Sequence, residues 1–170
     1  MENLIKEAKM GNPDAFAKLM QSQMQNMYKA ARSILYSDED IADAISDTIL
    51  TCWEKLSQLN HDQYFRTWMT RILINKCNDI LRKQKHLFFS EELPDVSVYD
   101  TQIENMEWQE ALNSLDEKYR LVMILYYVEG FKTSEISQIL EISESTVRSR
   151  LSRGRAQLAE EYISDRRKTV

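Results

Sequence analysis

An arginine-rich segment near the C-terminal end, TVRSRLSRGR, runs from Thr146 to Arg155 and holds four arginines in ten residues with no acid. Arginine guanidinium groups pair with guanine edges and with phosphate oxygens. The chain as a whole has 27 acidic and 22 basic side chains, a net charge of −5 and a pI near 5.2. A solvated basic helix face would have the same composition, but such a cluster in an acidic chain favours contact with nucleic acid.

The arginines fall on the second of two short helices, expected over 134–140 and 144–161 with the turn EIS between them. This arrangement is a helix-turn-helix, whose second helix enters the major groove of DNA. At about 100° per residue, one side of that helix is apolar and would pack on the isoleucines of the first helix. Ser143 can cap the second helix and direct its N–H groups at a phosphate. The opposite side would carry the candidate DNA-reading residues Ser145, Thr146, Arg148, Ser149, Ser152 and Arg153.

A second basic stretch precedes the middle of the chain and is opposed only by Asp79. Its cations are Arg66, Arg71, Lys76, Arg82, Lys83 and Lys85. Aromatic residues are interleaved with them, an arrangement that suits single-stranded nucleic acid because any base can stack on a ring. Phe65 and Trp68 stand three residues apart, however, so burial in a core explains this pair better than stacking on bases.

The segment from Asp38 to Glu54, before this basic stretch, has the opposite charge and contains no Lys or Arg. Its carboxylates are Asp38, Glu39, Asp40, Asp43, Asp47 and Glu54. DNA would repel a helix of this charge. The pattern alone fits a solvated face and a docking surface for a basic protein equally well.

The elements that position these residues are predicted to be helices, because three Gly and two Pro leave little material for the turns of an all-β fold. Residues 86–103 hold four acids, no base and Pro94, and they lack helical periodicity. We therefore predict an all-α fold with two small helical domains, 1–85 and 104–170, joined by a flexible acidic linker at 86–103. Four helices are expected in the first domain, with long ones starting near Pro13, Ser37 and Tyr64. In the second domain, Gly130 is placed to end a helix.

Several function classes are excluded by what the sequence lacks. It has no nucleophile–base set, no glycine-rich phosphate loop and no metal-ligand spacing, so we expect no enzyme activity, no cofactor and no metal site. The apolar run from Leu121 to Val128 is far shorter than the roughly 20 residues that span a bilayer. No secretory signal is present, and Cys52 and Cys77 are expected as reduced core thiols, so we expect a cytoplasmic protein with no membrane segment.

Three motifs in this order resemble the extracytoplasmic-function group of the sigma-seventy family, the bacterial RNA polymerase sigma factors. The first is DIADAISDTILTCW, from Asp40 to Trp53, and the second is FRTWMTRILINKCNDILRK, from Phe65 to Lys83. The third, from Leu115 to Leu158, is similar to the C-terminal domain of the family almost position by position. Each motif is only moderately specific, but the ordered set covers nearly the whole chain.

The resemblance implies a sigma factor that brings RNA polymerase core to promoters, with a helix-turn-helix domain for the duplex minus-thirty-five element. The first domain would dock on the polymerase and open the minus-ten element. The implied polymerase-binding residues are Asp40, Asp43, Ala44, Ser46 and Asp47, and the implied minus-ten residues are Asn60, His61, Arg71, Asn75, Lys76 and Arg82. The family also implies an anti-sigma factor as a further partner.

The chain departs from the family pattern at four positions. Ala44, Ser46 and Asp47 replace the usual Leu, Gln and Glu of the docking helix, and Glu141 stands where the family often has Gly. Glutamate adopts a positive φ poorly, so the turn conformation is in question at that position. The main alternative function is a stand-alone helix-turn-helix regulator whose first domain is a sensor or dimerisation module, and a nucleic-acid-processing enzyme is a more remote one.

Overall fold

The structure is a computed structural model that describes the backbone of residues 1–87 and 111–168, and the side chains of 1–84 and 111–160. The described residues form helices and no strand, which confirms the all-α prediction. The chain divides into two compact units, Met1–Asp95 and Val96–Val170, which are described separately below. The predicted linker at 86–103 lies outside the described residues except for its first two residues, which belong to the last helix of unit 1.

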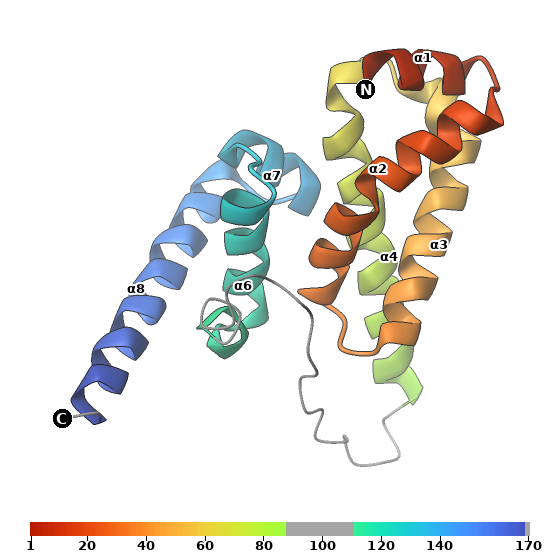
Figure 1. Cartoon of the computed structure of the whole chain (residues 1–170). Coiled ribbons are helices and arrows are strands. Elements are labelled where there is room, and N and C mark those ends of the chain that lie inside the picture. The colour runs from red at the N-terminus through yellow and green to blue at the C-terminus, as the bar shows by residue number, and fades with distance from the viewer. Residues whose placement is uncertain (88–110, 169–170) are drawn as a thin grey trace. The chain divides into compact units, whose positions relative to one another are not determined.

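Unit 1 contains four α-helices within its described residues, as expected. They are α1 (Glu2–Lys9), α2 (Pro13–Arg32), α3 (Asp38–Lys55) and α4 (Phe65–Leu87), with two short 3₁₀ turns, η1 (Leu56–Gln58) and η2 (Asp62–Tyr64), between α3 and α4. The three long helices lie side by side, and α1 crosses one end of them (Figure 1). The loop between η1 and η2 is therefore at the same end of the bundle as α1.

The long helices begin where the sequence offers caps. The Asn12 side chain accepts hydrogen bonds from the backbone N–H groups of Asp14 and Ala15, at 3.0 and 3.2 Å, and Pro13 occupies the first helical position. At α3, the Ser37 hydroxyl accepts from the Asp40 N–H at 3.4 Å. These caps satisfy donors that a helix start would otherwise leave unpaired, and they fix where the helices begin.

The core of unit 1 follows the predicted apolar spacing. Apolar residues at helical spacing are buried in each long helix, and the fully buried side chains include Leu19 of α2, Ile41 of α3, and Phe65 and Leu73 of α4. Cys52 and Cys77 are buried free thiols, as predicted. Burial raises the pKa of each thiol to about 12, because a thiolate would lose its hydration there.

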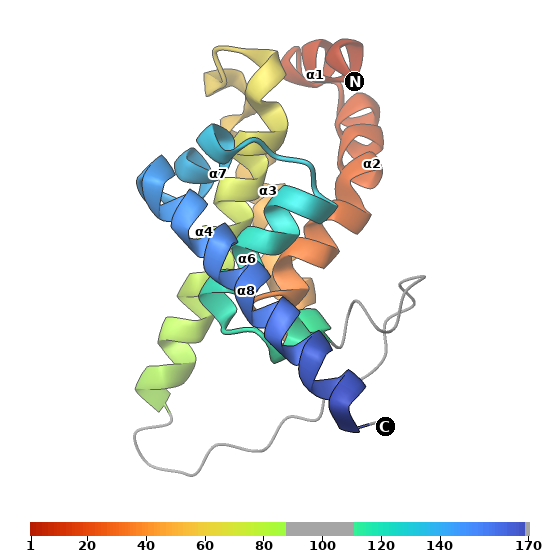
Figure 2. The same ribbon diagram turned by 90° about the vertical axis from the view of Figure 1, so that its left-hand side faces the viewer.

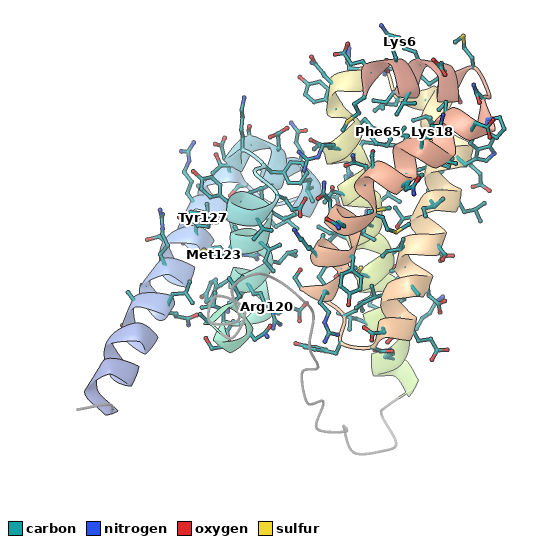
Figure 3. The ribbon with its side chains drawn as sticks, viewed as in Figure 1. Lys6, Lys18, Phe65, Arg120, Met123 and Tyr127 are labelled. Atoms are coloured by element: carbon teal, nitrogen blue, oxygen red, sulfur yellow. The ribbon has the colours of Figure 1, made fainter. Side chains whose placement is uncertain are left out.

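Unit 2 is built around a helical pair and the helix-turn-helix. Residues 111–114 are helical, followed by α6 (Glu117–Met123), the π-helical turn η4 (Ile124–Val128), α7 (Thr133–Leu140) and α8 (Glu144–Lys168). In Figure 2, α8 crosses α6, with α7 at one end of the pair. Gly154 permits the close approach of α8, because a Cβ there would lie 3.1 Å from the Cγ of Met123, which Figure 3 labels on α6.

The end of the α6–η4 segment confirms the predicted role of Gly130, which has a φ of 71° just beyond the helix. The Phe131 N–H donates to the Leu125 carbonyl at 3.0 Å and closes the helix end. The π-helical turn itself was not predicted, and it leaves Tyr126 and Tyr127 exposed. None of the helices in the described part of the chain is both long and apolar enough to cross a membrane.

Candidate nucleic-acid and protein interfaces

The second helix of the helix-turn-helix begins with a network of hydroxyl groups. The Ser143 hydroxyl accepts from the Thr146 N–H at 3.1 Å, which confirms the predicted cap. It also bonds to the hydroxyls of Ser145 and Thr146, at 2.9 and 2.7 Å. The helix start therefore presents small polar groups and the positive end of its dipole, an arrangement that attracts a phosphate.

The two sides of α8 differ as the 100° periodicity predicts. Val147 and Leu151 are buried against α7 and α6, whereas Ile142 and Leu158 are only half-buried. The candidate DNA-reading residues lie together on the other side, all exposed except the half-buried Thr146: Ser145, Thr146, Arg148, Ser149, Ser152 and Arg153. Short side chains between two arginines allow a close approach to a groove.

An acidic residue that the sequence reasoning did not single out lies at the start of this helix. The Glu144 Oε1 accepts hydrogen bonds from the Thr133 hydroxyl and from Arg148 Nη2, both at 2.6 Å. Both hydrogen bonds lower the pKa of the Glu144 carboxyl, and the bond from Thr133 contributes more than the bond from Arg148. Glu144 thus joins the N-terminal ends of α7 and α8 and orients Arg148. The spacing of four residues between Glu144 and Arg148 was the signal in the sequence.

The second arginine of this face is tied to α6. A hydrogen bond from Arg153 lowers the pKa of the Tyr119 phenol, and desolvation by burial opposes it. The Lys118 ammonium lies 4.9 Å from the centre of the Tyr119 ring. Arg153 therefore has an intramolecular partner in addition to any contact with DNA.

The turn of the helix-turn-helix has the left-handed conformation that a glycine would favour, although Glu141 occupies it. Glu141 has φ 55° and ψ 39°, the only positive φ outside glycine in the described residues. The Ile142 N–H donates to the Ser137 carbonyl at 3.2 Å, and the Ser137 hydroxyl donates to the Ile142 carbonyl at 2.6 Å. These bonds hold the turn, so the departure from the family pattern leaves its geometry intact.

The candidate minus-ten residues of α4 form an exposed row. Arg71, Asn75 and Arg82 are spaced by four and seven residues, lie on one side of the helix and are exposed. Arg82 forms an ion pair with Asp79 at 3.2 Å, and Lys76 is half-buried beside the row. The row gives unit 1 a basic surface of the kind that follows a nucleic-acid backbone.

Asn60 and His61 lie exposed in the loop between η1 and η2, just before α4. The ring centre of His61 is 6.1 Å from that of the exposed Tyr64, in an edge-to-face arrangement. Phe65 is 1% exposed, and Trp68 is half-buried with its ring 6.2 Å from that of Phe65. The core interpretation therefore holds for Phe65, and Tyr64 is the aromatic residue exposed beside the loop.

The acidic surface of α3 carries three of the five predicted docking residues fully in the open: Asp43, Ser46 and Asp47. Asp40 is half-buried and accepts a hydrogen bond from Gln84 of α4 at 2.8 Å. The inclusion of Ala44 was wrong, because its side chain is 0% exposed and packs in the core. A contact surface on α3 must be made by its neighbours.

Two exposed apolar residues on the same side of α3 were missed by the sequence reasoning. Leu50 is 57% and Trp53 is 42% exposed, and the Trp53 ring meets Phe16 of α2 edge to face at 4.9 Å. Leu50 lies within the arc of the helix that carries Asp43, Ser46 and Asp47, and Trp53 lies at its edge. We define these five residues as the α3 face. Their spacing in the sequence indicated the arc, but exposure could be read only from the structure.

The described residues form a helical protein with a helix-turn-helix in one unit, a class of motif common in DNA-binding proteins, and an acidic, partly apolar face in the other. Fold alone does not assign a function, so the comparison with known proteins completes the identification. Residues 19–87 match the family profile described as Sigma-70 region 2, and residues 105–158 match the one described as Sigma-70, region 4.

Full-length relatives agree with both matches. The chain is 30% identical over 170 residues to the RNA polymerase sigma factor NccH of Alcaligenes xylosoxydans xylosoxydans, covering 92% of this chain and 91% of that one. It is 27% identical over 173 residues to the ECF RNA polymerase sigma factor SigW of Bacillus subtilis, covering 91% and 92%. The chain belongs to the extracytoplasmic-function group of RNA polymerase sigma factors.

Solved structures share the fold. The structure of CnrH in complex with the cytosolic domain of CnrY has a TM-score of 0.71 and 27% identity, covering 96% of this chain and 97% of that one. The sigma factor RpoE in complex with the anti-sigma factor NepR from Bartonella quintana has a TM-score of 0.73 at 23% identity, covering 85% and 94%. The sigma-factor function is thus supported, and the stand-alone regulator is not favoured.

Proposed function

We propose that the α3 face docks this sigma factor on RNA polymerase core. Leu50 and Trp53 are large apolar side chains exposed beside the carboxylates of Asp43 and Asp47. An apolar centre with a charged rim is the usual composition of a protein interface, and exposed aromatic residues are common hot spots. This exposed pairing of apolar and acidic residues carries the proposal, because a merely solvated helix face would not need Leu50 and Trp53.

In this proposal each domain reads one promoter element. The domain at 104–170 reads the duplex minus-thirty-five element through the exposed side of α8. The domain at 1–85 binds the opened minus-ten element through the exposed row of α4 and through Asn60 and His61. The basic row and the exposed loop support this division, since an extruded base must be met by polar groups that bond to its edge.

The chain would work by recognition alone, in the cytoplasm, without a cofactor, and the polymerase would supply the chemistry. An anti-sigma factor is its third proposed partner. The similar structure of CnrH contains a second protein, the cytosolic domain of CnrY. An inhibitor that covered the α3 face would compete directly with the polymerase for Leu50 and Trp53.

The direct test is transcription by a holoenzyme reconstituted from core polymerase and the full chain, on a promoter library randomised at both elements. Sequencing of the transcripts should show two separate sets of preferred bases. Variants of α8 should alter only the upstream set, and Asn60→Ala with His61→Ala only the downstream set. Transcripts without an upstream preference, or with both sets unchanged in the variants, would contradict the division between domains.

Arg148→Ala should lower use of the preferred upstream element by about tenfold or more, because an arginine–guanine pair contributes about 1–3 kcal/mol of discrimination. Arg153→Ala should have a smaller effect on base preference, since Arg153 also bonds to Tyr119. The same library measures both. The control is Lys18→Ala, which removes an exposed positive charge from α2 (Figure 3). Equal effects of Lys18→Ala and Arg148→Ala would show that only net charge matters.

A further inference from the structure

The loop that carries Asn60 and His61 is held by a residue from the start of the chain. Lys9, in the last turn of α1, donates from its Nζ to the Leu59 carbonyl at 2.5 Å and also to the Asp62 carboxylate. The two acceptors lie on either side of Asn60 and His61. One ammonium group therefore bridges both ends of the segment whose side chains are exposed.

This bridge is a tertiary contact across 50 and 53 residues, and it is largely shielded from water. The side chains of Lys9 and Asp62 are only 22% and 20% exposed. A partly buried ion pair is geometrically demanding, because each charge loses hydration that its protein partners must replace. It therefore fixes the position of the loop more strongly than a pair in open solvent would.

The backbone around the bridge restricts the same loop. The Leu59 N–H donates to the Leu56 carbonyl and the Tyr64 N–H to the His61 carbonyl, each at 3.1 Å. On the other side, Lys9 is carried by a helix that buries Ile5 and Ala8. Both sides of the bridge are thus anchored, and the short stretch at Asn60 and His61 is presented outward.

We propose that Lys9 is a positioning residue for the reading of a base extruded from the opened minus-ten element. It rests on the proposed function of the Asn60–His61 loop, and it adds a residue of α1, which precedes the region 2 match at 19–87. Lys9 does not touch the base. It sets where Asn60 and His61 meet the base edge, and a shift of that loop weakens hydrogen bonds that depend on direction.

A rival explanation is electrostatic, in which Lys9 merely offsets the charge of Asp62 beside the DNA. The two explanations predict different changes in the Lys9→Met and Asp62→Asn variants. Lys9→Met removes a positive charge and Asp62→Asn removes a negative one, so a pure charge effect moves DNA affinity in opposite directions. Loss of positioning moves base discrimination in the same direction, downward, in both variants.

The test uses the holoenzyme reconstituted with the full-length variant chain and a promoter library randomised in the downstream element. We expect Lys9→Met and Asp62→Asn each to reduce the preference for the favoured base by about tenfold, the change produced by about 1.4 kcal/mol of lost discrimination. The upstream preference should stay at the wild-type level. Lys6→Met is the matched control, because Lys6 carries the same charge on the exposed side of α1 (Figure 3).

The possible results distinguish the positioning role of Lys9 from the proposed function of the Asn60–His61 loop. Wild-type base preference in Lys9→Met, with altered preference in Asn60→Ala and His61→Ala, would overturn the positioning role and leave the proposed function standing. Wild-type preference in all of these variants would overturn both. Should Lys9→Met reduce the melting temperature strongly, Asp62→Asn, which keeps an oxygen acceptor for Lys9, carries the test. Opposite shifts in DNA affinity with unchanged discrimination would establish the electrostatic explanation instead.

Discussion

Individual side chains of α8, the proposed DNA-reading helix, would govern its contacts with phosphates and bases. Arg148 has a carboxylate partner within its own helix, Glu144, at 2.6 Å. That carboxylate would lie near phosphates when α8 enters a groove, and it holds the guanidinium back from them. The negative charge should therefore lower affinity for DNA of any sequence, while the hydrogen bond orients Arg148.

Glu144→Gln should strengthen binding to nonspecific duplex and make it more dependent on salt. Glutamine keeps an oxygen that can accept from Thr133, but it no longer holds Arg148 by charge. One additional phosphate contact steepens the slope of log K against log salt by about 0.9. Titrations of the full chain with random-sequence duplex at several salt concentrations measure this slope. Glu160→Gln, an exposed position two-thirds of the way along α8, is the control. Equal slopes for Glu144→Gln and the wild type would contradict the restraining role.

The two buried cysteines determine how the folded chain reacts with alkylating reagents and how its stability depends on pH. Burial raises the pKa of both thiols from the ordinary value of 9.0 to about 12. At pH 8 the folded protein should therefore resist iodoacetamide, and both thiols should be modified after denaturation, as mass spectrometry would show. The unfolded state loses its thiol protons above about pH 9 while the folded state keeps them, so stability should fall as pH rises from about 9 to 12. Rapid alkylation of the native chain at pH 8 would contradict this account.

At the scale of elements, the helices and their buried faces were predictable because caps and apolar periodicity are local signals. Asn12, Ser37 and Ser143 mark helix starts, and Gly130 marks a helix end, as the structure confirms. The π-helical turn η4 and the bridge from Lys9 were not predictable. The first differs from an α-helix by a small shift of hydrogen bonds, and the second joins residues 50 positions apart.

The turn between α7 and α8 offers a test of element geometry. Glu141→Gly should stabilise unit 2 by roughly 0.5–1 kcal/mol, because the left-handed conformation costs a residue with a Cβ about 1–2 kcal/mol and glycine forfeits part of that gain through chain entropy. Urea denaturation of the full chain, followed by circular dichroism, should show a higher midpoint with an unchanged slope. Glu141→Ala keeps the Cβ and should give no such gain. A destabilised Glu141→Gly variant would show that the Glu141 side chain, not its backbone, holds the turn.

At the scale of the whole molecule, the family followed from the order of three motifs, while the exposure of each proposed contact residue could be read only from the structure. Ala44 lies on α3, the proposed docking helix, but is buried, and Leu50 and Trp53 were overlooked because an apolar residue in a helix is usually assigned to the core. The charge pattern was correctly located: carboxylates gather on α3, and arginines on the exposed side of α8. A net charge of −5 should weaken nonspecific binding of the free chain to DNA, since nonspecific affinity arises from phosphate neutralisation.

Docking through the α3 face is the central proposal, so a reversal of the charge on this face tests it most directly. Each substitution of the Asp43→Lys, Asp47→Lys variant raises the net charge by 2, so the net charge changes from −5 to −1. Both positions are exposed and lysine is a good helix former, so the melting temperature should stay near the wild-type value. Glu7→Lys with Glu160→Lys makes the same change of charge at exposed sites on α1 and α8, outside the α3 face.

The measurement is co-purification of core RNA polymerase with the tagged full-length chain at moderate salt. We predict that the Asp43→Lys, Asp47→Lys variant loses the polymerase, because repulsion replaces attraction at two neighbouring positions of the interface. The Glu7→Lys, Glu160→Lys control should retain it. Recovery of the polymerase with the α3 variant in wild-type amounts would contradict the account and would mean that the acidic helix is only a solvated face.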